Sequence, residues 1–553
     1  MTETRRVATR LRNHMPNELP TTVGAVLRRS VAADPVHDAV VTCAETLSYQ
    51  TLSDRSATMA RALAASGAGK GTRIALLAPD GILWLTTFLA AMRIGAVVAP
   101  LSTLCTAPEL AYVLRHCDAQ VFIGVRRFLR HNYAERLTAA LPGLANSRGP
   151  LRLRNAPFLR SIWLDDATGA DWAGSLAALL ARAAAPDAPD AELLAAMENE
   201  VTPSDDAVII YTSGSTSLPK AVLHTQRSVA HHPQILGEHF RIKASDRMMP
   251  LLPLFWIGGL AMALEVLQAG ATLLYPESPA LDTVCDSIVT LRANRVNTWG
   301  PQLARLRMAI AARGIDVESI GGLAQLREPD GKPIPAERAA NMLGMTESFG
   351  PHSSEPLDTV VPAHRVGSSG RATSDYERRV VDPATGEVLG PGRSGELQLR
   401  GGGLMKGFYK VDPRQVFTPD GFYPTGDIVR IEEDGHLFFE GRRGDMLKTA
   451  GANVSRLEVE AALRALPEVA LPIVVGLPDA EIGQLVVAAV VPAEGSAPTE
   501  ASLQAALRER LSSYKVPRRI LVIAPDEVLW TPSNKIRLAD MAKLIATRLA
   551  PSG

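Results

Sequence analysis

The chain has 553 residues, and its 58 Lys and Arg residues balance its 58 Asp and Glu residues. This length is enough for two or more domains around a large core, and the balanced charge argues against a dedicated nucleic-acid-binding protein. The four cysteines form no CxxC pair. They predict reduced thiols in a cytoplasmic protein rather than zinc ligands or a disulfide framework.

The first 20 residues contain four arginines but no apolar core segment, so we predict no secretory signal. The longest apolar stretch, residues 82–98, is interrupted by Arg93 and Gly95. It predicts a core helix rather than a membrane span.

Strand and helix patterns alternate in residues 21–123. Residues 72–78 and 95–100 have strand patterns, and residues 82–92 between them have the pattern of a buried helix. Such alternation predicts a parallel sheet with crossover helices.

Residues 124–204 are less regular and locally basic, with a loop predicted at 183–190. The simpler interpretation of the basic character is a solvated insertion, and the alternative is a patch that meets a membrane surface or an acidic carrier protein. The arginines concerned are Arg126, Arg127, Arg130, Arg148, Arg152, Arg154 and Arg160.

Residues 211–222 read Tyr-Thr-Ser-Gly-Ser-Thr-Ser-Leu-Pro-Lys-Ala-Val and follow a short apolar run that predicts a buried strand. A strand that enters such a loop brings backbone N–H groups, hydroxyls and one lysine to a common point, which suits a polyphosphate. A Walker A loop is excluded because no Gly-Lys-Ser/Thr occurs. A plain solvated turn is the alternative.

The order of these residues resembles the phosphate-binding signature of the adenylate-forming superfamily, which includes acyl-CoA synthetases, adenylation domains of peptide synthetases and luciferases. Ser217 and Ala221 replace two signature glycines, which implies a stiffer loop. The resemblance implies ATP-phosphate contacts from Thr212, Ser213, Gly214, Ser215, Thr216 and Lys220. A following helix is predicted to begin within residues 224–229.

Residues 253–260 resemble the block of this superfamily that gates the acyl pocket. The resemblance implies pocket positions for Trp256 and Gly258, with Trp299 on another wall; a packed core tryptophan is the alternative for Trp256. No acidic residue lies between Leu251 and Met262. Relatives that activate amino acids carry an aspartate there, so an acid with an apolar tail is predicted.

Residues 343–347 resemble a further superfamily block, which implies nucleotide contacts from Leu343, Gly344, Met345 and Thr346 and a magnesium ion held by Glu347. Leu343 replaces the usual aromatic residue, so its contact with adenine is expected to be purely apolar. The segment between Pro335 and Leu343 is shorter than in the superfamily. One helix–strand unit is therefore predicted to be deleted or rebuilt.

Glycine-rich segments at 367–370 and 395–401 predict a small β subdomain. In residues 423–427 the resemblance implies that Asp427, together with Arg442, binds the ribose hydroxyls, and an acceptor pair with a planar donor suits a diol. Residues 441–460 resemble the hinge and thioester-forming loop, with Gly444 as the pivot or, alternatively, a turn glycine. Gly451 and Ser455 belong to the same implied coenzyme A and hinge region.

The last hundred residues contain strand patterns at 473–476 and 486–491, a helix pattern at 501–511 and a turn at 514–517. Lys535 matches the catalytic lysine of the superfamily, although a lysine near a C-terminus is commonly a surface charge. The resemblance covers roughly residues 25–545.

The predicted fold is α/β. A large N-terminal domain (1–442) of parallel-sheet layers with a small β subdomain precedes a small mobile α+β domain (443–553). The implied reaction is activation of an apolar carboxylic acid by Mg·ATP to acyl-AMP, followed by transfer to coenzyme A. The alternatives are an adenylating enzyme that loads a carrier protein and a nucleotide-binding pseudoenzyme. A homodimer and peripheral membrane contact are left open.

Overall fold

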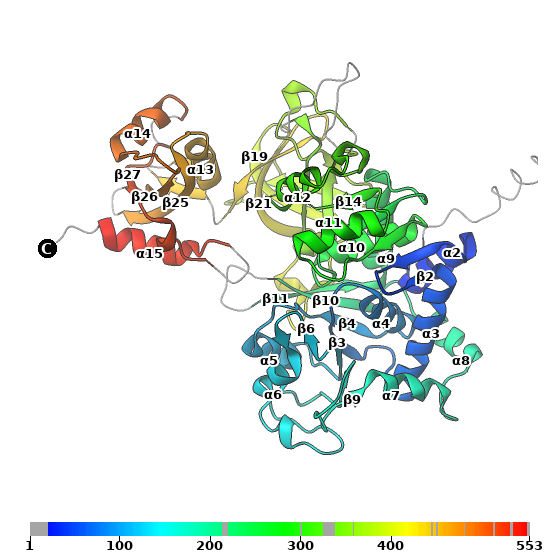
Figure 1. The fold of residues 1–553 in the computed structure, drawn as a ribbon. Coiled ribbons are helices and arrows are strands. Elements are labelled where there is room, and N and C mark those ends of the chain that lie inside the picture. Colours follow the sequence, from blue (N-terminus) through cyan, green and yellow to red (C-terminus); the bar gives the residue numbers. More distant parts are fainter. Residues whose placement is uncertain are drawn as a thin grey trace, which may run out of the picture. The chain divides into compact units, whose positions relative to one another are not determined.

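The structure is a computed structural model that forms two compact units (Figure 1). The N-terminal unit comprises residues 1–377 and 400–422, and the C-terminal unit comprises 378–399 and 423–553. The predicted domain boundary after residue 442 stays a prediction. The described residues are 20–212, 219–298, 301–323, 338–357, 359–443, 446–449, 452–479, 482–511, 515–530 and 535–549.

The N-terminal unit is built on an eight-stranded sheet with the order β20-β11-β10-β4-β3-β5-β8-β9. Parallel pairing joins β9, β8, β5, β3, β4 and β10, whereas β11 and β20 add antiparallel to that edge. The predicted parallel sheet is therefore confirmed. The strands are β3 (Arg73–Leu77), β4 (Val97–Pro100), β5 (Val121–Gly124), β8 (Ser161–Leu164), β9 (Gly174–Ser175), β10 (Asp206–Thr212), β11 (Lys220–Thr225) and β20 (Gly407–Phe408).

The predicted core helix is α4 (Ile82–Arg93), which lies between β3 and β4 in the chain and is buried over most of its length. Within the described residues, no helix is both long enough and apolar enough to cross a membrane. Cys105, Cys117 and Cys285 are buried and Cys43 is exposed, each without a disulfide bond.

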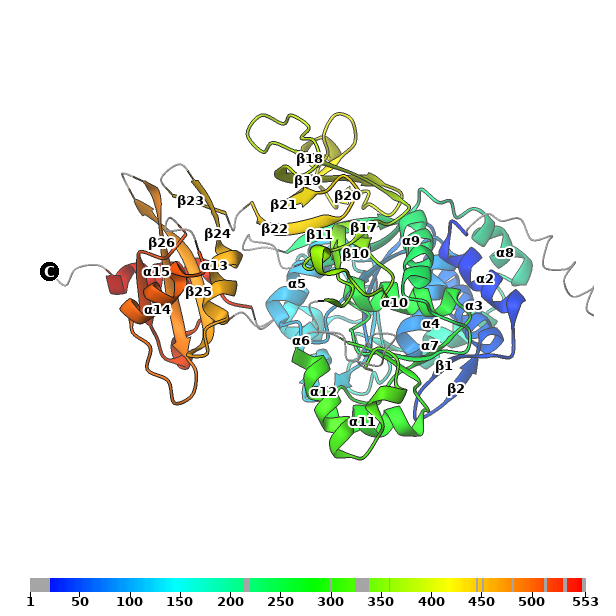
Figure 2. The same ribbon diagram turned by 90° about the horizontal axis from the view of Figure 1, so that it is seen from above.

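A second sheet of the N-terminal unit has the order β14-β12-β13-β1-β2. Helices α9 (Gln226–His239) and α10 (Ile257–Gln268) lie side by side, and both contact α2 (Val23–Ala33), as Figures 1 and 2 show. The strands are β1 (Asp38–Val41), β2 (Thr46–Ser48), β12 (Arg247–Pro250), β13 (Thr272–Leu274) and β14 (Arg295–Asn297). One apolar cluster extends through the strands and helices of this unit.

The helix predicted to begin within residues 224–229 is confirmed, since α9 starts at Gln226, whereas His224 still belongs to β11 and pairs with Val208. Thr225 caps α9, and its side chain accepts a hydrogen bond from the backbone of Ser228. A Thr-x-x-Ser capping box fixes the first helical residue at Gln226.

The basic segment 124–204 is part of the main sheet rather than a detached insertion, since β8 and β9 extend that sheet. Its helix α8 (Ala191–Asn199) carries Glu198, a buried carboxylate that forms ion pairs with Arg28 of α2 and Arg93 of α4. Buried charges persist only when they are paired. These ion pairs therefore hold segment 124–204 against the core. Most of the arginines of that segment are exposed.

The C-terminal unit contains a four-stranded sheet and a five-stranded sheet. The first has the order β18-β19-β21-β22, with β18 (Tyr376–Val381), β19 (Ser394–Gly401), β21 (Tyr423–Ile431) and β22 (Leu437–Arg442). It matches the predicted small β subdomain. The second comprises β23 (Met446–Thr449), β24 (Ala452–Ser455), β25 (Val469–Asp479), β26 (Gly483–Pro492) and β27 (Arg519–Val522).

Alternate residues of β25 and β26 point to opposite faces of the second sheet and build two small cores. Val474 and Val486 pack with α13 (Arg456–Arg464) and α14 (Glu500–Arg508), whereas Val475 and Val487 pack with α15 (Leu538–Leu549). The predicted strands and helix of this region are confirmed, within a few residues at their ends.

Candidate active site

The predicted phosphate loop connects the two strands of the β10–β11 hairpin. Thr212 and Lys220 face each other in register where the hairpin opens, and the intervening residues 213–218, with Ser213, Gly214, Ser215 and Thr216, lie outside the described residues. Lys220 is exposed, and its Nζ lies 5.2 Å from the centre of the Phe408 ring. The hairpin therefore fixes where the loop begins and ends and places one ammonium group beside it.

Ala221, which replaces a signature glycine, is a buried residue of β11 that pairs with Tyr211 of β10. A regular strand position accepts any Cβ, because its backbone is extended. This replacement therefore does not strain the hairpin.

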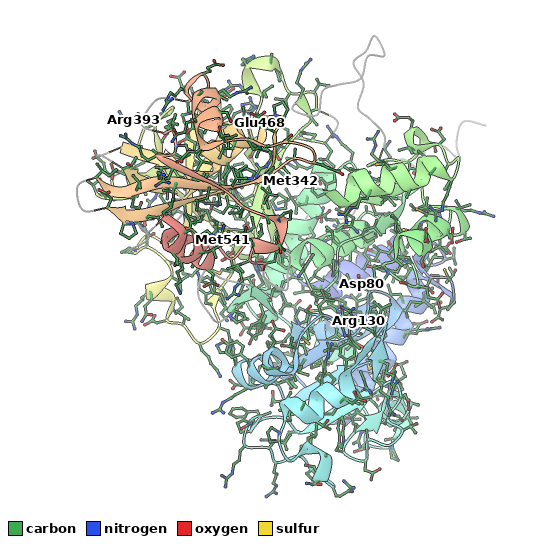
Figure 3. All side chains as sticks on the ribbon, turned by 60° about the vertical axis from the view of Figure 1, so that its left-hand side comes forward. Asp80, Arg130, Met342, Arg393, Glu468 and Met541 are labelled. Carbon is green, nitrogen blue, oxygen red and sulfur yellow. The ribbon has the colours of Figure 1, made fainter. Side chains whose placement is uncertain are left out.

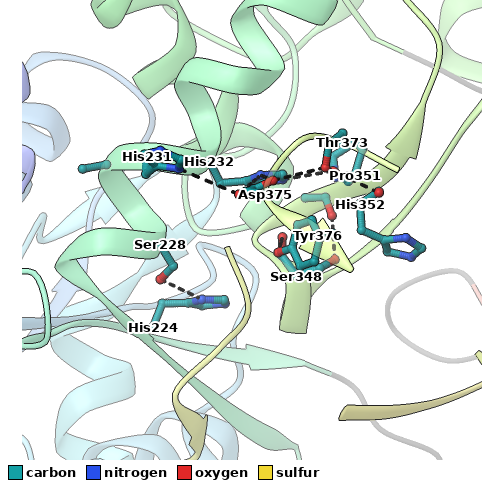
Figure 4. Close-up of polar contacts among 12 residues, drawn as sticks. His224, Ser228, His231, His232, Ser348, Pro351, His352, Thr373, Asp375 and Tyr376 are labelled. Carbon is teal, nitrogen blue, oxygen red and sulfur yellow. Dashed lines mark hydrogen bonds and ion pairs between the residues drawn. The ribbon is translucent and has the colours of Figure 1, made fainter. Parts of the chain in front are cut away.

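The Thr-Glu-Ser turn (Thr346–Ser348) follows strand β15 (Met342–Met345). Each of its three carbonyl oxygens accepts a hydrogen bond from a different segment of the N-terminal unit; Figure 4 shows Tyr376 beside Ser348. The donors are His224 Nε2 to Thr346 (2.7 Å), the backbone N–H of Met405 to Glu347 (2.8 Å) and Tyr376 Oη to Ser348 (2.8 Å). The turn is therefore held from three sides, with the side chains of Thr346 and Glu347 half-buried.

His224 is completely buried and neutral. Burial lowers the pKa of His224 to about 4, although its hydrogen bond to Thr346 acts in the opposite direction. Since a carbonyl only accepts, the proton is on Nε2, and Nδ1 lies 3.3 Å from the hydroxyl of Ser228. The ring packs edge-on against Phe349 at 4.9 Å between centroids.

A second buried histidine fastens α9 to the strand that follows the turn, β16 (Gly350–Ser354). His232 Nδ1 lies 2.9 Å from Asp375 Oδ2, and its Nε2 lies 2.9 Å from the carbonyl oxygen of Pro351 (Figure 4). Each ring nitrogen therefore faces an acceptor oxygen. Burial raises the pKa of Asp375, but the hydrogen bond and charge of His232 outweigh it and leave the pKa below its usual range.

The remaining residues of the predicted nucleotide block lie on β15, which pairs with β16. A Cβ at Gly344 would collide with the carbonyl oxygen of Gly350, so glycine is required there. Leu343 and Met345 are half-buried. Of the shortened segment between Pro335 and Leu343, residues 336 and 337 lie outside the described residues, and its C-terminal end is in β15.

The oxygen atoms of the Thr346 and Glu347 side chains are suitable ligands for a magnesium ion whose other ligands come from the nucleotide. Across the described residues, no group of three or more His, Cys, Asp or Glu side chains could hold a metal. Mg²⁺ is commonly bound through one or two carboxylates, with phosphates and water completing its shell. Glu347 and Thr346 would supply a carboxylate and a hydroxyl of that kind.

Trp256 is 50% exposed and precedes the first turn of α10, so it is not a packed core residue. Its ring meets the Phe255 ring edge-on at 5.6 Å between centroids. Gly258 lies half-buried in the first turn of α10. Trp299 lies outside the described residues.

The predicted ribose-binding pair lies in the C-terminal unit on two adjacent strands. Asp427 of β21 and Arg442 of β22 are register partners, and Asp427 Oδ1 accepts a hydrogen bond from Arg442 Nε at 2.7 Å. The carboxylate is buried, whereas the guanidinium is half-exposed. This arrangement presents a fixed acceptor and an accessible planar donor, as a diol requires.

Lys535 is exposed and directly precedes Ile536 in the C-terminal unit. Ile536 forms a β-bridge with Trp530, and the Arg537 N–H donates a hydrogen bond to the carbonyl of Leu529. Leu529 and Ile536 also pack on the core below α15. Gly444 and Gly451 lie outside the described residues, as does the side chain of Ser455 at the end of β24.

The family follows from two matches. A model of the AMP-binding enzyme family matches residues 27–409, and a model of the AMP-binding enzyme C-terminal domain matches residues 458–535. The chain belongs to the AMP-binding enzyme family. The resemblance to the adenylate-forming superfamily is thereby confirmed.

Curated relatives of this AMP-binding enzyme match over nearly the whole chain. The putative acyl-CoA synthetase YngI of Bacillus subtilis is 27% identical over 557 residues, covering 95% of this chain and 97% of the relative. The sulfoacetate–CoA ligase of Cupriavidus necator is 30% identical over 510 residues, covering 89% of this chain and 91% of the relative.

Solved structures confirm the fold of this AMP-binding enzyme. The anthranilate CoA ligase AuaEII in complex with anthranoyl-AMP has a TM-score of 0.74 at 22% identity, with 96% of this chain and 99% of that chain covered. ATP-bound MatB from Rhodopseudomonas palustris has a TM-score of 0.70 at 24% identity, covering 95% and 99%.

We expect His224→Phe to lower kcat/KM for acid activation roughly tenfold, because the Thr346 carbonyl loses its side-chain donor and keeps only the backbone N–H of Phe349 at 3.2 Å, a loss of about 1–2 kcal/mol. His224→Gln, which can still donate, should recover part of the loss. Steady-state kinetics of ATP–pyrophosphate exchange provides the measurement. Equal rates for His224→Phe and the wild type would show that the hydrogen bond does not position the turn.

The same variant should change how stability depends on pH. The folded pKa of His224, about 4, lies below its ordinary value of 6.5, so below pH 6.5 the unfolded chain takes up a proton that the folded chain does not. The wild type should therefore lose up to about 3 kcal/mol more than His224→Phe as the pH falls from 6.5 to 4. Thermal unfolding across this interval tests the difference in slope.

Proposed function

We propose that the chain activates a carboxylic acid with an apolar body, forming acyl-AMP from ATP and then transferring the acyl group to the thiol of coenzyme A. At the level of enzyme class, the chain is an AMP-forming acid–CoA ligase, since it belongs to the AMP-binding family and its curated relatives include CoA ligases. The apolar acid and the residue roles below go further and are proposals.

The observation that carries this proposal is the anchored Thr-Glu-Ser turn of the N-terminal unit, whose three carbonyls are each bound from a different segment. Adenylation brings a carboxylate to the anionic α-phosphate of ATP. Fixed donors and cations are needed there, because preorganised charge costs no reorganisation as the reaction proceeds. A turn held from three sides provides such a fixed platform for Thr346 and Glu347.

In the first half-reaction, a carboxylate oxygen of the acid bonds to the α-phosphorus while the bond to pyrophosphate breaks. Lys220 and the hydroxyls of the phosphate loop would bind the departing phosphates, and Lys535 would neutralise charge at the reacting centre. A magnesium ion held by Glu347 would supply further neutralisation when bound.

In the second half-reaction, the thiolate of coenzyme A attacks the acyl carbon, and the carbon–oxygen bond to AMP breaks. The thiol proton passes to solvent. Asp427 and Arg442 would hold the ribose of AMP through both steps. Gly444 would act as the pivot between domains 1–442 and 443–553, so that rotation of the small domain replaces Lys535 with the thioester-forming loop.

An apolar acid is favoured because residues 251–262 contain no charged side chain and Trp256 offers an accessible apolar ring. The names of the relatives do not settle the acid, since they include ligases for sulfoacetate, indoleacetate and oxalate. Each additional buried methylene of a substrate should contribute about 0.8 kcal/mol until the pocket is full.

ATP–pyrophosphate exchange with a panel of apolar, amino, hydroxy and dicarboxylic acids tests the proposal. The best acid should be apolar, exchange should stop when EDTA removes magnesium, and coenzyme A should be acylated faster than the phosphopantetheine group of a carrier protein. Faster acylation of the carrier would instead indicate a carrier-loading enzyme. Tight ATP binding without exchange on any acid would indicate a pseudoenzyme.

We expect Trp256→Ala to shift the preference of the enzyme toward bulkier acids while thermal stability changes little, since half of the ring is already exposed. The ratio of kcat/KM for a branched or cyclic acid to that for a straight-chain acid should rise roughly tenfold, the effect of one or two methylenes. A uniform loss of activity on all acids would exclude a gating role for Trp256.

A further inference from the structure

A cavity of about 550 Å³ lies within the N-terminal unit, next to the loop that precedes α10. Its walls are mainly apolar and rich in proline, with no Lys, Arg or His side chain among its lining residues. Besides Asp80, two exposed glutamates line it: Glu45, which is paired with Arg55, and Glu277. The lining comes from residues 42–45, 79–83 and 275–279, together with Thr103, Val125, Phe128, Pro250, Leu251, Pro253, Phe255, Val284 and Gln302.

Asp80 brings a carboxylate to this cavity from the loop between β3 and α4 (Figure 3). One of its oxygens accepts a hydrogen bond from the backbone N–H of Leu254 at 2.7 Å. Burial raises the pKa of Asp80 to about 6, although this hydrogen bond acts against the rise. The carboxylate is thus mostly ionised at neutral pH, with no ion-pair partner among the described residues.

Tyr275 brings a phenolic hydroxyl that is left without a partner. The side chain is 1% exposed, and the described residues offer its Oη no hydrogen bond. Both residues line the same cavity, and burial and then the charge of Asp80 raise the pKa of Tyr275 well above its usual value. Buried tyrosine hydroxyls usually have a partner, so a group is missing here.

The chemistry of these two residues restricts what that group is. A carboxylate would be repelled by Asp80, so the reacting end of an acid does not belong there. An ammonium group only donates and would leave the phenolic O–H without an acceptor. An alcohol or phenol satisfies both residues, because its hydroxyl donates to the carboxylate and accepts from Tyr275.

The cavity is lined by sequence neighbours of the predicted acyl-pocket residues, although Trp256 and Gly258 are not among its lining residues. Phe255 lines the cavity and directly precedes Trp256, and Gln302 lines it three residues after Trp299. Asp80 also holds the backbone of Leu254 in the same loop. A substrate that passes Trp256 would therefore be next to Phe255, which lines the cavity.

We propose that this cavity receives the far end of the acid substrate and that Asp80 and Tyr275 bind a hydroxyl group carried there. The substrate class is thus an acid with an apolar body and an alcohol or phenol remote from its carboxyl group. This inference rests on the proposed function, since it assigns the cavity to the acid.

Paired acids of increasing length, each with and without a terminal hydroxyl, provide the test in ATP–pyrophosphate exchange. At one length, the hydroxylated acid should exceed its partner in kcat/KM roughly tenfold to hundredfold, mostly through KM, as expected for a hydrogen bond to a charged group. Tyr275→Phe and Asp80→Asn should each bring this ratio close to one. A ratio of one or below at every length in the wild type would overturn the inference.

Tyr49→Phe is a matched control, because Tyr49 is equally buried but its hydroxyl donates to protein carbonyls, with Ala271 O at 2.7 Å. It should lower thermal stability without changing the preference for hydroxylated acids. Tyr275→Phe should not lower stability. If Tyr275→Phe lowered thermal stability as much as Tyr49→Phe does, the Tyr275 hydroxyl would instead be hydrogen-bonded to a structural water. That result would contradict the inference.

Failure of the hydroxyl site can be distinguished from failure of the proposed function. Exchange on unsubstituted acids without any hydroxyl preference would leave the proposed function intact and refute the hydroxyl site. If no acid were activated, the proposed function would fail, and calorimetric titration with the hydroxylated acids would then decide. Binding weakened by Tyr275→Phe would support the site, and absence of binding would refute it.

Discussion

Lys535→Ala should reduce acyl-AMP formation by about 10²–10³, because a single charge-stabilising donor at a developing anion commonly contributes that much to the rate. The same variant should still convert supplied acyl-AMP into the thioester at close to the wild-type rate, since Lys535 acts only in adenylation. The exposed position of Lys535, next to the Trp530–Ile536 bridge, favours this role over a packing role. Single-turnover assays of the two half-reactions provide the measurement.

Two controls sharpen this prediction. Lys535→Arg retains the charge with a different shape and should lose less than the alanine variant. Lys543→Ala removes an exposed lysine of α15 whose ammonium lies 3.9 Å from Asp540, and should affect neither half-reaction. Equal damage to both half-reactions by Lys535→Ala would show that the lysine is not the adenylation residue.

Gly444→Pro should have the opposite effect. We expect adenylation and pyrophosphate exchange to survive largely intact, whereas thioester formation from supplied acyl-AMP should fall by orders of magnitude. Proline fixes φ near −65°, so a pivot that has to adopt two backbone states would be trapped in one. Together, Lys535→Ala and Gly444→Pro should therefore each disable one half-reaction.

Gly444→Ala is the matched control, since alanine restricts the backbone far less than proline and should retain more thioester formation. Thermal unfolding of both variants separates a pivot from a turn glycine. A parallel fall of both half-reactions with thermal stability in Gly444→Pro would mean that Gly444 is only a turn residue and that the pivot lies elsewhere.

The alternating pattern of the first 123 residues predicted the parallel sheet because each buried strand there is a short apolar run that a periodic helix follows. The continuous apolar runs of β25 and β26 were equally informative, since both faces of these strands are buried, each in a different core. Such local patterns decide local structure and, through the right-handed crossover rule, much of the sheet.

The anchors of the Thr-Glu-Ser turn could not be predicted in this way. His224 was expected within a helix start, and only its strand pairing with Val208 places it beneath Thr346, more than a hundred residues away. Tyr376 and Met405 reach the same turn from still other segments. A buried histidine in an apolar strand is a weak signal, because its partner is set by tertiary packing.

Asp80 and Tyr275 were missed for a related reason. Each stands at the end of a strand, in a different sheet, and neither belongs to a motif of the superfamily. Their common cavity arises only when the two sheets pack together. A single aspartate after an apolar strand is otherwise an ordinary loop residue.

The central claim is that the acid attacks the α-phosphate of ATP, and isotope transfer tests it most directly. The enzyme would be incubated with its best acid labelled with oxygen-18 in the carboxyl group, together with ATP and coenzyme A, and the products would be analysed by mass spectrometry. Because the thiol displaces AMP by breaking the acyl carbon–oxygen bond, the account predicts that each AMP carries one labelled oxygen. Unlabelled AMP, or label found in inorganic phosphate beside ADP, would contradict it.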